Sequence, residues 1–183
     1  MPLDSPRTSP PVDTVVYQGE RIDLLLRRVP TASGREITRE VVRHPGAVIV
    51  LPVLRDGRIV MIRNLRHTVG EELWELPAGT LEPPEDPAVR ARCELEEETG
   101  YRAAQIIPFG WFYTSPGILT EKMYGFIAAG LEPGPQALEE NETITVTALS
   151  PRQAREMILD NRIVDAKTIA VLLKYMASST GLV

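Results

Sequence analysis

The chain has 183 residues, a length that suits one domain or one domain with a small appendage. Hydrophobic residues make up 43% of it, enough for a core, and the formal net charge of −5 argues against a nucleic-acid partner, because phosphate neutralisation needs clustered Lys and Arg. The single cysteine, Cys93, excludes an intrachain disulfide and favours a cytoplasmic protein. We expect no membrane partner, since no apolar run approaches the ~20 residues needed to span a bilayer.

The N-terminal quarter predicts a tail and a small sheet. Residues 1–13 are rich in Pro and Ser, and we expect them to be disordered. Residues 14–17, 21–29 and 35–43 predict strands that are separated by turns. The sequence therefore predicts an antiparallel unit over residues 14–45 and a main domain over residues 46–183.

The main domain alternates strands with helices. Residues 47–54 and 58–63 flank Arg55-Asp56-Gly57, a pattern that predicts a hairpin, and a loop is expected to follow up to Asp86. Pro87 in a first turn, a capping Asp86 and a closing Gly100 predict a helix over 87–99. Further elements are expected as strands at 106–113, 122–129 and 143–149, and as helices at 150–160 and 165–176. This order is typical of an α/β domain with a mixed sheet.

The predicted helix carries an acidic face. Glu94, Glu97 and Glu98 are spaced i, i+3 and i+4, so they lie on one side of the helix. Carboxylates placed in this way repel one another, and a hard divalent cation such as Mg²⁺ relieves the repulsion. When such a cluster stands alone, a solvated acidic surface explains it as well.

A longer pattern surrounds this cluster. Residues 79–101, GTLEPPEDPAVRARCELEEETGY, resemble the Nudix box, which is Gly, five residues, Glu, seven residues, then Arg-Glu-apolar-x-Glu-Glu-x-Gly-apolar. The pattern falls on Gly79, Glu85, Glu94, Leu95, Glu97, Glu98, Gly100 and Tyr101. The resemblance implies the Nudix fold, a mixed β-sheet sandwiched between helices, with Gly79 in a tight turn and the helix presenting its carboxylates to a metal-bound pyrophosphate.

One box position departs from the pattern. Cys93 stands where the family has Arg, and the resemblance implies that this Arg braces the carboxylates by pairing with a box glutamate. A thiol has no fixed positive charge and cannot do this. Three interpretations remain open: Arg90 or Arg92 serves instead, although Arg92 points about 100° away around the helix; the enzyme is slower; or the chain is a ligand-binding relative that no longer hydrolyses.

Outside the box, the chain is most similar to ADP-ribose pyrophosphatases and related nucleotide-sugar hydrolases, over roughly residues 14–177. Ser115-Pro116-Gly117 and Glu121 match a segment of that group, and residues 139–142 match its acidic loop. The resemblance implies Glu140 as the catalytic base, together with the box carboxylates Glu97 and Glu98. It implies metal ligands at the Ala78 carbonyl, Glu94, Glu97, Glu98 and Glu142. It implies substrate contacts at Arg66, Arg39, Arg43, Glu121 and Tyr17.

Several of these matches have simpler explanations. Glu121 and Glu142 are also compatible with solvated loop glutamates, and Arg66 with a surface arginine. Tyr17, Trp74, Trp111 and Tyr113 are candidates for stacking on a base, although core packing is the favoured explanation for them.

The resemblance implies hydrolysis of ADP-ribose to AMP and ribose 5-phosphate with Mg²⁺, for which Mn²⁺ is a possible substitute. The alternatives are another nucleotide sugar, such as GDP-mannose or ADP-glucose, and the ligand-binding protein suggested by Cys93. The resemblance also implies a homodimer, in which the N-terminal sheet packs across a two-fold axis and is exchanged between subunits. A small three-stranded sheet cannot bury both of its faces alone, which agrees with this expectation.

Overall fold

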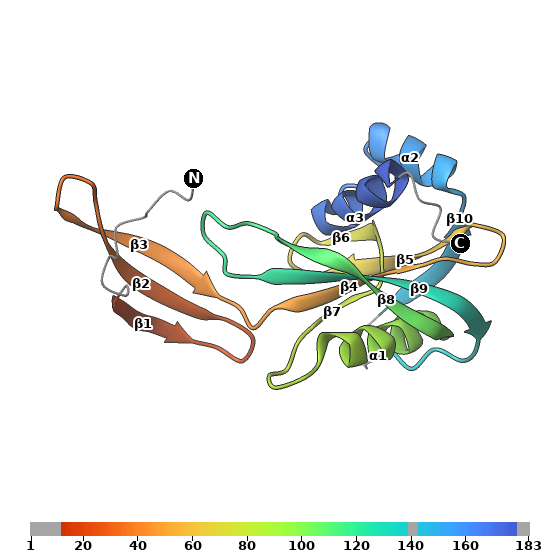
Figure 1. Ribbon diagram of the computed structural model, residues 1–183, viewed down its shortest axis with the longest axis horizontal. Coiled ribbons are helices and arrows are strands. Elements are labelled where there is room, and N and C mark those ends of the chain that lie inside the picture. The colour runs from red at the N-terminus through yellow and green to blue at the C-terminus, as the bar shows by residue number, and fades with distance from the viewer. Residues whose placement is uncertain (1–11, 139–142, 179–183) are drawn as a thin grey trace, which may run out of the picture. The chain divides into compact units, whose positions relative to one another are not determined.

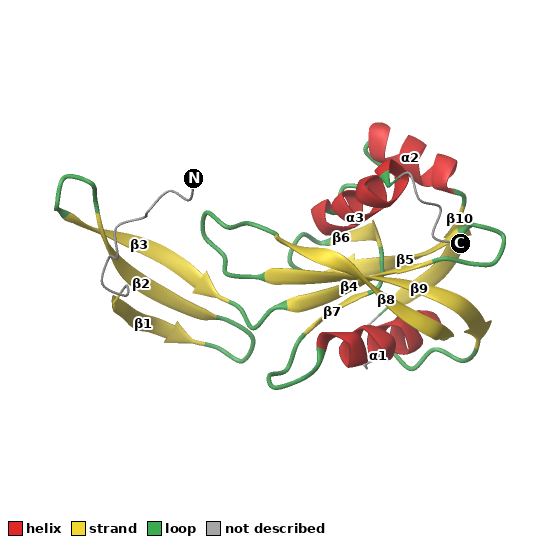
Figure 2. Ribbon diagram, viewed as in Figure 1, coloured by secondary structure: helices red, strands yellow, loops and turns green. Residues whose placement is uncertain are grey.

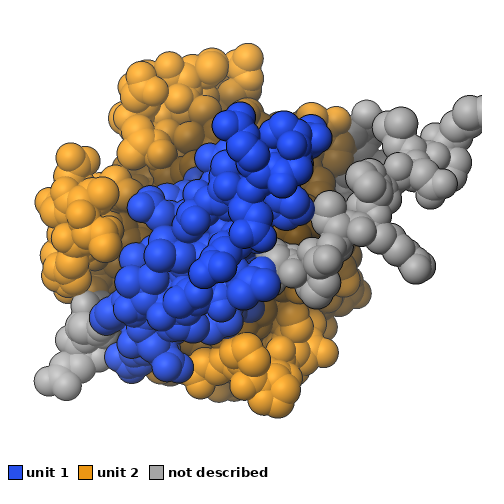
Figure 3. Space-filling view, turned by 90° about the vertical axis from the view of Figure 1, so that its left-hand side faces the viewer, with its two compact units in different colours: residues 1–45, 115–121 blue, residues 46–114, 122–183 orange. Residues whose placement is uncertain are grey.

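The computed structural model describes residues 12–138 and 143–178. These residues form two compact units (Figure 3). The first unit contains residues 12–45 together with 115–121, and the second contains residues 46–114 and the described residues from 122 onward.

The first unit is built on an antiparallel sheet in the order β1-β2-β3 (Figure 1). Its strands are β1 (Val12–Gln18), β2 (Asp23–Pro30) and β3 (Glu36–Arg43). Val12 and Asp13 lie in β1, so the prediction that they belong to a disordered tail is wrong, because both pair with β2. Residues 1–11 of that tail lie outside the described residues.

A segment from later in the chain joins this first unit. The amide of Val42 donates to the carbonyl of Ile118 at 2.8 Å, and the amide of Thr120 donates to the carbonyl of Val42 at 2.9 Å. Residues 115–121, which include the Ser115-Pro116-Gly117 marker, therefore extend the end of β3 by backbone pairing.

The second unit contains two sheets, in the orders β7-β4-β9-β8 and β10-β5-β6. β4 pairs with β9 in parallel and with β7 antiparallel, which makes the first of these sheets mixed. The strands are β4 (Ala47–Pro52), β5 (Ile59–Arg66), β6 (Glu71–Glu75), β7 (Ala78–Thr80), β8 (Tyr101–Tyr113), β9 (Lys122–Pro133) and β10 (Ile144–Leu149).

Helices cover both faces of the mixed sheet (Figures 1 and 2). β4 is buried along its whole length, as expected for a strand enclosed on both sides. Ile49 and Leu51 pack into a core with α2 (Pro151–Leu159) and α3 (Ala166–Ala177). Val48 and Val50 point the opposite way, into a second core beneath α1 (Pro87–Thr99). The expected sheet between helices is thus confirmed.

Two local predictions in this unit are wrong. The turn at Arg55-Asp56-Gly57 exists, but it is flanked by an isolated bridge between Val53, which follows β4, and Ile59, and β4 and β5 belong to different sheets. β4 instead pairs with β7 and β9, which enclose it on both edges. The loop expected before the box helix also contains two short strands, β6 and β7.

The helix boundaries follow their capping residues. The side chain of Asp86 accepts a hydrogen bond from the Ala88 amide at the start of α1, and Gly100 ends the helix with a positive φ of 75°. Ser150 and Asp165 cap α2 and α3 in the same way. Within the described residues, no helix is long and apolar enough to cross a membrane.

Candidate active site

The box helix is anchored by its apolar side. Ala91 and Leu95 are buried in the core beneath the sheet. Glu94 and Glu98, next to that apolar ridge, are also carried inside, and their residues are only 5% and 2% exposed. Since a buried carboxylate is costly unless it is paired or hydrogen-bonded, their partners decide what this part of the molecule does.

Glu94 lies directly against the glycine that opens the box. A Cβ atom added to Gly79 would come within 1.3 Å of the Glu94 Oε1 atom. Gly79 lies in β7 rather than in a tight turn, and it is absent from the glycines with positive φ. The pattern therefore needs Gly at this position because the carboxylate occupies the space that any side chain would fill, and the tight-turn explanation is wrong.

Glu98 is held by the same short strand. Its Oε2 atom accepts a hydrogen bond of 3.0 Å from the amide of Ala78. The backbone at this end of α1 is fastened as well, because the Glu98 carbonyl accepts from Gln136 Nε2 at 2.6 Å and the Glu97 carbonyl accepts from the Ala137 amide at 3.0 Å. The two carboxylates are thus fixed one helical turn apart against β7.

Arg90 supplies the guanidinium that position 93 lacks. Its Nε atom donates to Glu94 Oε1 at 2.8 Å, and one terminal nitrogen lies 2.5 Å from that oxygen. The same terminal nitrogen lies 3.7 Å from Glu97 Oε2, so one cation spans two box carboxylates. Burial alone would lower the pKa of Arg90, but Glu94 and then Glu97 raise it overall, which keeps the side chain charged.

Arg92, the other candidate for bracing, contacts a different part of the chain, and Cys93 is poorly suited to act as a nucleophile. Arg92 donates to the Ala103 carbonyl in β8 at 2.5 Å, on another side of the helix. Cys93 is half-buried, and its pKa is raised by burial and by the charge of Glu97. A thiol with a raised pKa stays protonated near neutral pH and is a poor nucleophile, which argues against a catalytic cysteine.

A second buried charge cluster lies beside the box. Glu75, at the end of β6, has no exposed surface and accepts two hydrogen bonds from Arg66, at 2.7 Å and 2.6 Å. Lys167 of α3 contacts Glu75 at 2.6 Å and Asp165 at 2.9 Å. Burial tends to raise the pKa of Glu75, but Arg66 and Lys167 outweigh it and lower the pKa overall.

The predicted site residues fall into four sets. Ala78, Glu94, Glu97 and Glu98 meet at α1 and β7. Arg66 belongs to the Glu75 cluster, and the charge of Glu98 helps to raise its pKa. Glu140 and Glu142 lie outside the described residues. The remaining predicted contacts, Tyr17, Arg39, Arg43 and Glu121, lie in the first unit.

The four residues in the first unit differ in their exposure and in their ion-pair contacts. Tyr17 is exposed on β1, and Arg39 is exposed on β3. Arg43 contacts Asp23 at 2.6 Å. Glu121 lies 3.7 Å from the imidazole of His44, and its side chain is largely buried. Glu121 is therefore not the solvated loop glutamate that served as its alternative explanation.

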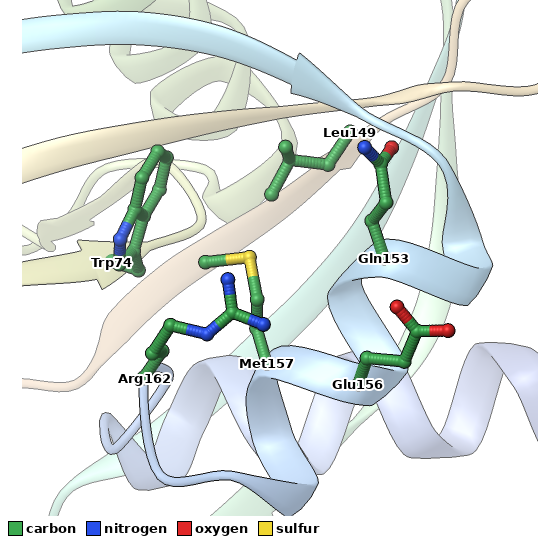
Figure 4. A pocket seen from close by; sticks show the side chains of 6 residues that line it. All are labelled: Trp74, Leu149, Gln153, Glu156, Met157 and Arg162. Carbon is green, nitrogen blue, oxygen red and sulfur yellow. The ribbon is translucent and has the colours of Figure 1, made fainter.

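The aromatic candidates differ in burial: Trp74 packs against the core, whereas Trp111 and Tyr113 are exposed. Trp74 packs against the core, and Arg63 lies over its ring at 5.6 Å. Its side chain lines a pocket of about 500 Å³ between β6, β10 and α2 (Figure 4). The pocket residues are Trp74, Leu149, Gln153, Glu156, Met157 and Arg162. Trp111 and Tyr113 are instead 54% and 50% exposed, so core packing does not explain them.

The box donors have the chemistry of a divalent-cation site. Glutamate and backbone carbonyl oxygens are the hard ligands that Mg²⁺ prefers. In the part of the chain that the structure describes, no three Asp, Glu, His or Cys side chains converge on one point. Glu94 instead contacts Arg90, and Glu98 contacts the Ala78 amide. The donor set therefore fits such a cation.

Sequence reasoning missed Glu75 and Lys167 and left the partner of Glu94 undecided. Glu75 falls in a segment expected to be a loop, and Lys167 is distant in the chain, so neither could be linked to Arg66. The i, i+4 spacing of Arg90 and Glu94 was the one local indication of their ion pair.

Comparisons with known proteins agree with the box. The NUDIX domain family model matches residues 42–172. The chain is 37% identical over 163 residues to an ADP-ribose pyrophosphatase of Bacillus subtilis (strain 168), covering 88% of both chains. It is 38% identical over 169 residues to an ADP-ribose pyrophosphatase of Mycobacterium tuberculosis (strain ATCC 25618 / H37Rv), covering 91% of this chain and 82% of the relative.

A solved structure shares the fold. The crystal structure of an ADP compounds hydrolase superposes with a TM-score of 0.79 at 18% identity, and the match covers 94% of this chain and 95% of that one. At this identity the likeness concerns the fold alone.

Proposed function

This chain belongs to the NUDIX family and is a Nudix pyrophosphohydrolase, and we propose that its substrate is a nucleoside diphosphate sugar, with ADP-ribose preferred. Water adds across the P–O–P bond, so that ADP-ribose yields AMP and ribose 5-phosphate. The preference for ADP-ribose is supported by the two similar ADP-ribose pyrophosphatases.

The observation that carries this proposal is the buried carboxylate pair on α1. Glu94 and Glu98 are almost fully enclosed, yet they lie against a strand whose glycine leaves room for a carboxylate alone. Hydrophobic residues would stabilise such a position at least as well as buried charge does. Retaining two carboxylates there is therefore best explained by a cation that carries the phosphate groups of a substrate.

We propose Mg²⁺ as that cation, with Mn²⁺ as a substitute. Glu94, Glu97, Glu98 and the Ala78 carbonyl would hold it, with Glu142 as a further ligand. Members of this family generally use divalent metal ions. When bound, such an ion neutralises phosphate charge and lowers the pKa of a coordinated water.

Arg90 acts as a positioning residue in this proposal. It orients Glu94 and restrains Glu97 from one side of the helix, so the two carboxylates stay close together. This contact favours an active enzyme over the ligand-binding alternative that Cys93 suggested.

We assign phosphate binding to Arg66, proton removal to Glu140 and further substrate contacts to residues of the first unit. Arg66 uses two N–H groups on Glu75, and a guanidinium has five, so within the described residues three donors remain for a substrate phosphate. Glu140 would take the proton of the attacking water. Contacts to the rest of the substrate would come from Tyr17, Arg39, Arg43 and Glu121.

We also propose that the chain is a homodimer in the cytoplasm. Apolar side chains are exposed on the first unit, among them Val12, Val15, Val16, Ile22 and Leu26. Exposed apolar surface of this kind marks an interface. Light scattering at micromolar concentration should give twice the monomer mass, and a monomer would refute the dimer.

The substrate is tested with a panel of ADP-ribose, ADP-glucose and GDP-mannose, each with Mg²⁺ or Mn²⁺, scored for released nucleoside monophosphate. We expect ADP-ribose to give the highest kcat/KM and chelator to abolish turnover. Higher kcat/KM with GDP-mannose would change the assigned substrate, whereas no release from any member would refute the proposed hydrolysis.

A further inference from the structure

The last turn of the box helix is acidic, although it lies at the negative end of the helix. It reads Glu96-Glu97-Glu98-Thr99, so three carboxylates stand at the end toward which the backbone carbonyls of α1 point. The aligned peptide dipoles give a helix a partial negative charge at its C-terminus, which disfavours carboxylates there. Two of the proposed metal ligands, Glu97 and Glu98, therefore lie in the least favourable turn of their helix.

The backbone carbonyls of this turn need hydrogen-bond donors. The last carbonyls of a helix have no partners inside it, and for this reason helix ends fray. The amide of Gly100 donates to the carbonyl of Glu96 at 2.9 Å, at the very end of α1. The carbonyls of Glu97 and Glu98 come next, and their donors must come from another part of the chain.

The segment 134–137, which directly follows β9, supplies both donors (Figure 1). Gln136 Nε2 donates to the Glu98 carbonyl at 2.6 Å, and the Ala137 amide donates to the Glu97 carbonyl at 3.0 Å. Gln136 lies 38 residues beyond Glu98 in the chain. A remote segment thus provides the capping that a helix usually obtains from residues beside its end.

The closing glycine of the box lets this segment approach the helix. Gly100 has a positive φ of 75°, and a Cβ atom added to it would come within 3.0 Å of the Gln136 amide nitrogen. A Cβ atom added to Gly134 would come within 2.9 Å of the Gly100 carbonyl oxygen. The two stretches of backbone are therefore in direct contact, and a side chain at position 100 would push the segment away from the carbonyls that it caps.

The carboxylate of Glu97 depends most on this support. The side chain of Glu98 is held by the Ala78 amide at 3.0 Å. The side chain of Glu97 is 42% exposed and lies 3.7 Å from Arg90, a longer and weaker contact. Because a loosely held side chain is aimed mainly by its backbone, the hydrogen bond from Ala137 helps to set the direction of this carboxylate.

We propose that Gln136 and Ala137 are positioning residues for the metal site, because they hold the helical turn that carries Glu97 and Glu98. They act through the backbone of α1 rather than by contact with the cation or the substrate. This inference rests on the proposed function, since it takes the two glutamates as ligands of the proposed cation.

Mn²⁺ affinity, measured by calorimetry without substrate, tests this role. Gln136→Leu removes the side-chain donor and should weaken Mn²⁺ binding about tenfold, at the lower end of the usual loss for a group that orients a metal ligand. Ala137→Pro removes the other donor, since proline has no N–H, and should weaken binding as well. Gln136→Lys keeps an N–H donor and adds a charge suited to a helix C-terminus, so it should bind Mn²⁺ as the wild type does.

Gln153→Leu is the matched control, because the side chain of Gln153 also caps a helix, at the start of α2. Both Gln→Leu variants should lower the melting temperature, but Gln153→Leu should keep the wild-type Mn²⁺ affinity. Hydrogen exchange provides a second measurement on the metal-free protein. Exchange of the Gly100 amide, which closes the last turn of α1, should become faster in Gln136→Leu and stay unchanged in Gln153→Leu.

The outcomes separate the positioning role from the proposed hydrolysis. If ADP-ribose is hydrolysed while Gln136→Leu and Ala137→Pro bind Mn²⁺ as tightly as the wild type, the positioning role is overturned and the function stands. Equal weakening in Gln153→Leu or in Gln136→Lys also overturns it. If Mn²⁺ binding changes as expected but no nucleotide sugar is hydrolysed, the proposed function fails and the positioning role stands. A wild type that binds no Mn²⁺ refutes the proposed cation, and the positioning role with it.

Discussion

Two clusters of buried charge lie close together in the second unit, and they are balanced differently. Around Glu75, two cations, Arg66 and Lys167, face two carboxylates, those of Glu75 and Asp165. On α1, Arg90 contacts both Glu94 and Glu97, while Glu98 accepts from a neutral amide. In the first cluster two cations face two carboxylates, whereas on α1 one arginine contacts two carboxylates. We therefore expect the first cluster to support the fold and the second to hold the proposed cation.

The largest expected effect is on stability and comes from the balanced cluster. Glu75→Ala leaves Arg66 and Lys167 without their shared partner, and removing one member of a buried pair costs about 3–5 kcal/mol of unfolding free energy. Glu72→Ala, on the same strand, breaks an exposed pair with Arg63 and should cost ~1 kcal/mol or less. Urea unfolding measures both variants. Equal losses would remove the distinction between the buried and exposed pairs.

The next effect is on rate and comes from the α1 cluster. Glu98→Gln should lower kcat about 10²–10³-fold, the usual loss for a preorganised electrostatic group. The amide oxygen of Gln can still accept from Ala78, so the melting temperature should stay the same or rise as repulsion falls. Glu96→Gln, which has the same charge change on another side of the helix, is the control. Similar rate losses in both would show that the helix face has been misassigned.

A smaller effect should follow from the bracing arginine. Arg90→Ala frees Glu94 and Glu97, and a supporting contact of this kind is worth about 10–100-fold in activity or metal affinity. Adding Cys93→Arg to that variant should restore most of the loss, because the guanidinium returns at the family's usual position. Mn²⁺ affinity, measured by calorimetry without substrate, should fall and recover in parallel.

Single substitutions of Cys93 provide the controls for this rescue. In the wild-type background Cys93→Arg should change little, since Arg90 already contacts Glu94, and Cys93→Ser should keep most of the rate. Abolished turnover in Cys93→Ser would restore the catalytic-thiol interpretation. Failure of Cys93→Arg to rescue Arg90→Ala would mean that Arg90 acts through its own packing.

The smallest expected effect is the pH dependence of stability. The pKa of Glu75 is lowered from its ordinary value of 4.5, because Arg66 and Lys167 outweigh burial. A lowered folded-state pKa contributes stability that is present above 4.5 and is lost as the pH falls through the folded value, at ~1.4 kcal/mol per unit of lowering. The wild type should therefore lose stability in acid more steeply than Glu75→Ala. Parallel pH profiles of the two proteins would contradict this.

The sequence alone determined the elements whose hydrogen bonds are local. Asp86, Pro87 and Gly100 predicted the bounds of α1 correctly, because a helix bonds to itself and its caps lie within a few residues of its ends. The spacing of the box glutamates likewise predicted the family, since the pattern lies within one continuous segment. Ser150 and Asp165 identified the starts of α2 and α3 for the same reason.

Only the tertiary structure decided the pairing of distant segments. The sequence paired β4 with β5, whereas β4 found β7 and β9, because a strand's partners are chosen by burial across the whole sheet. Glu75 met Lys167 from 92 residues away, at a point where two sheets and α3 converge. Arg90 rather than Arg92 contacts Glu94 because the two side chains point in different directions from the helix. Arg90 lies on the side of β7 and Arg92 on the side of β8, and packing of the helix against the sheet sets these directions.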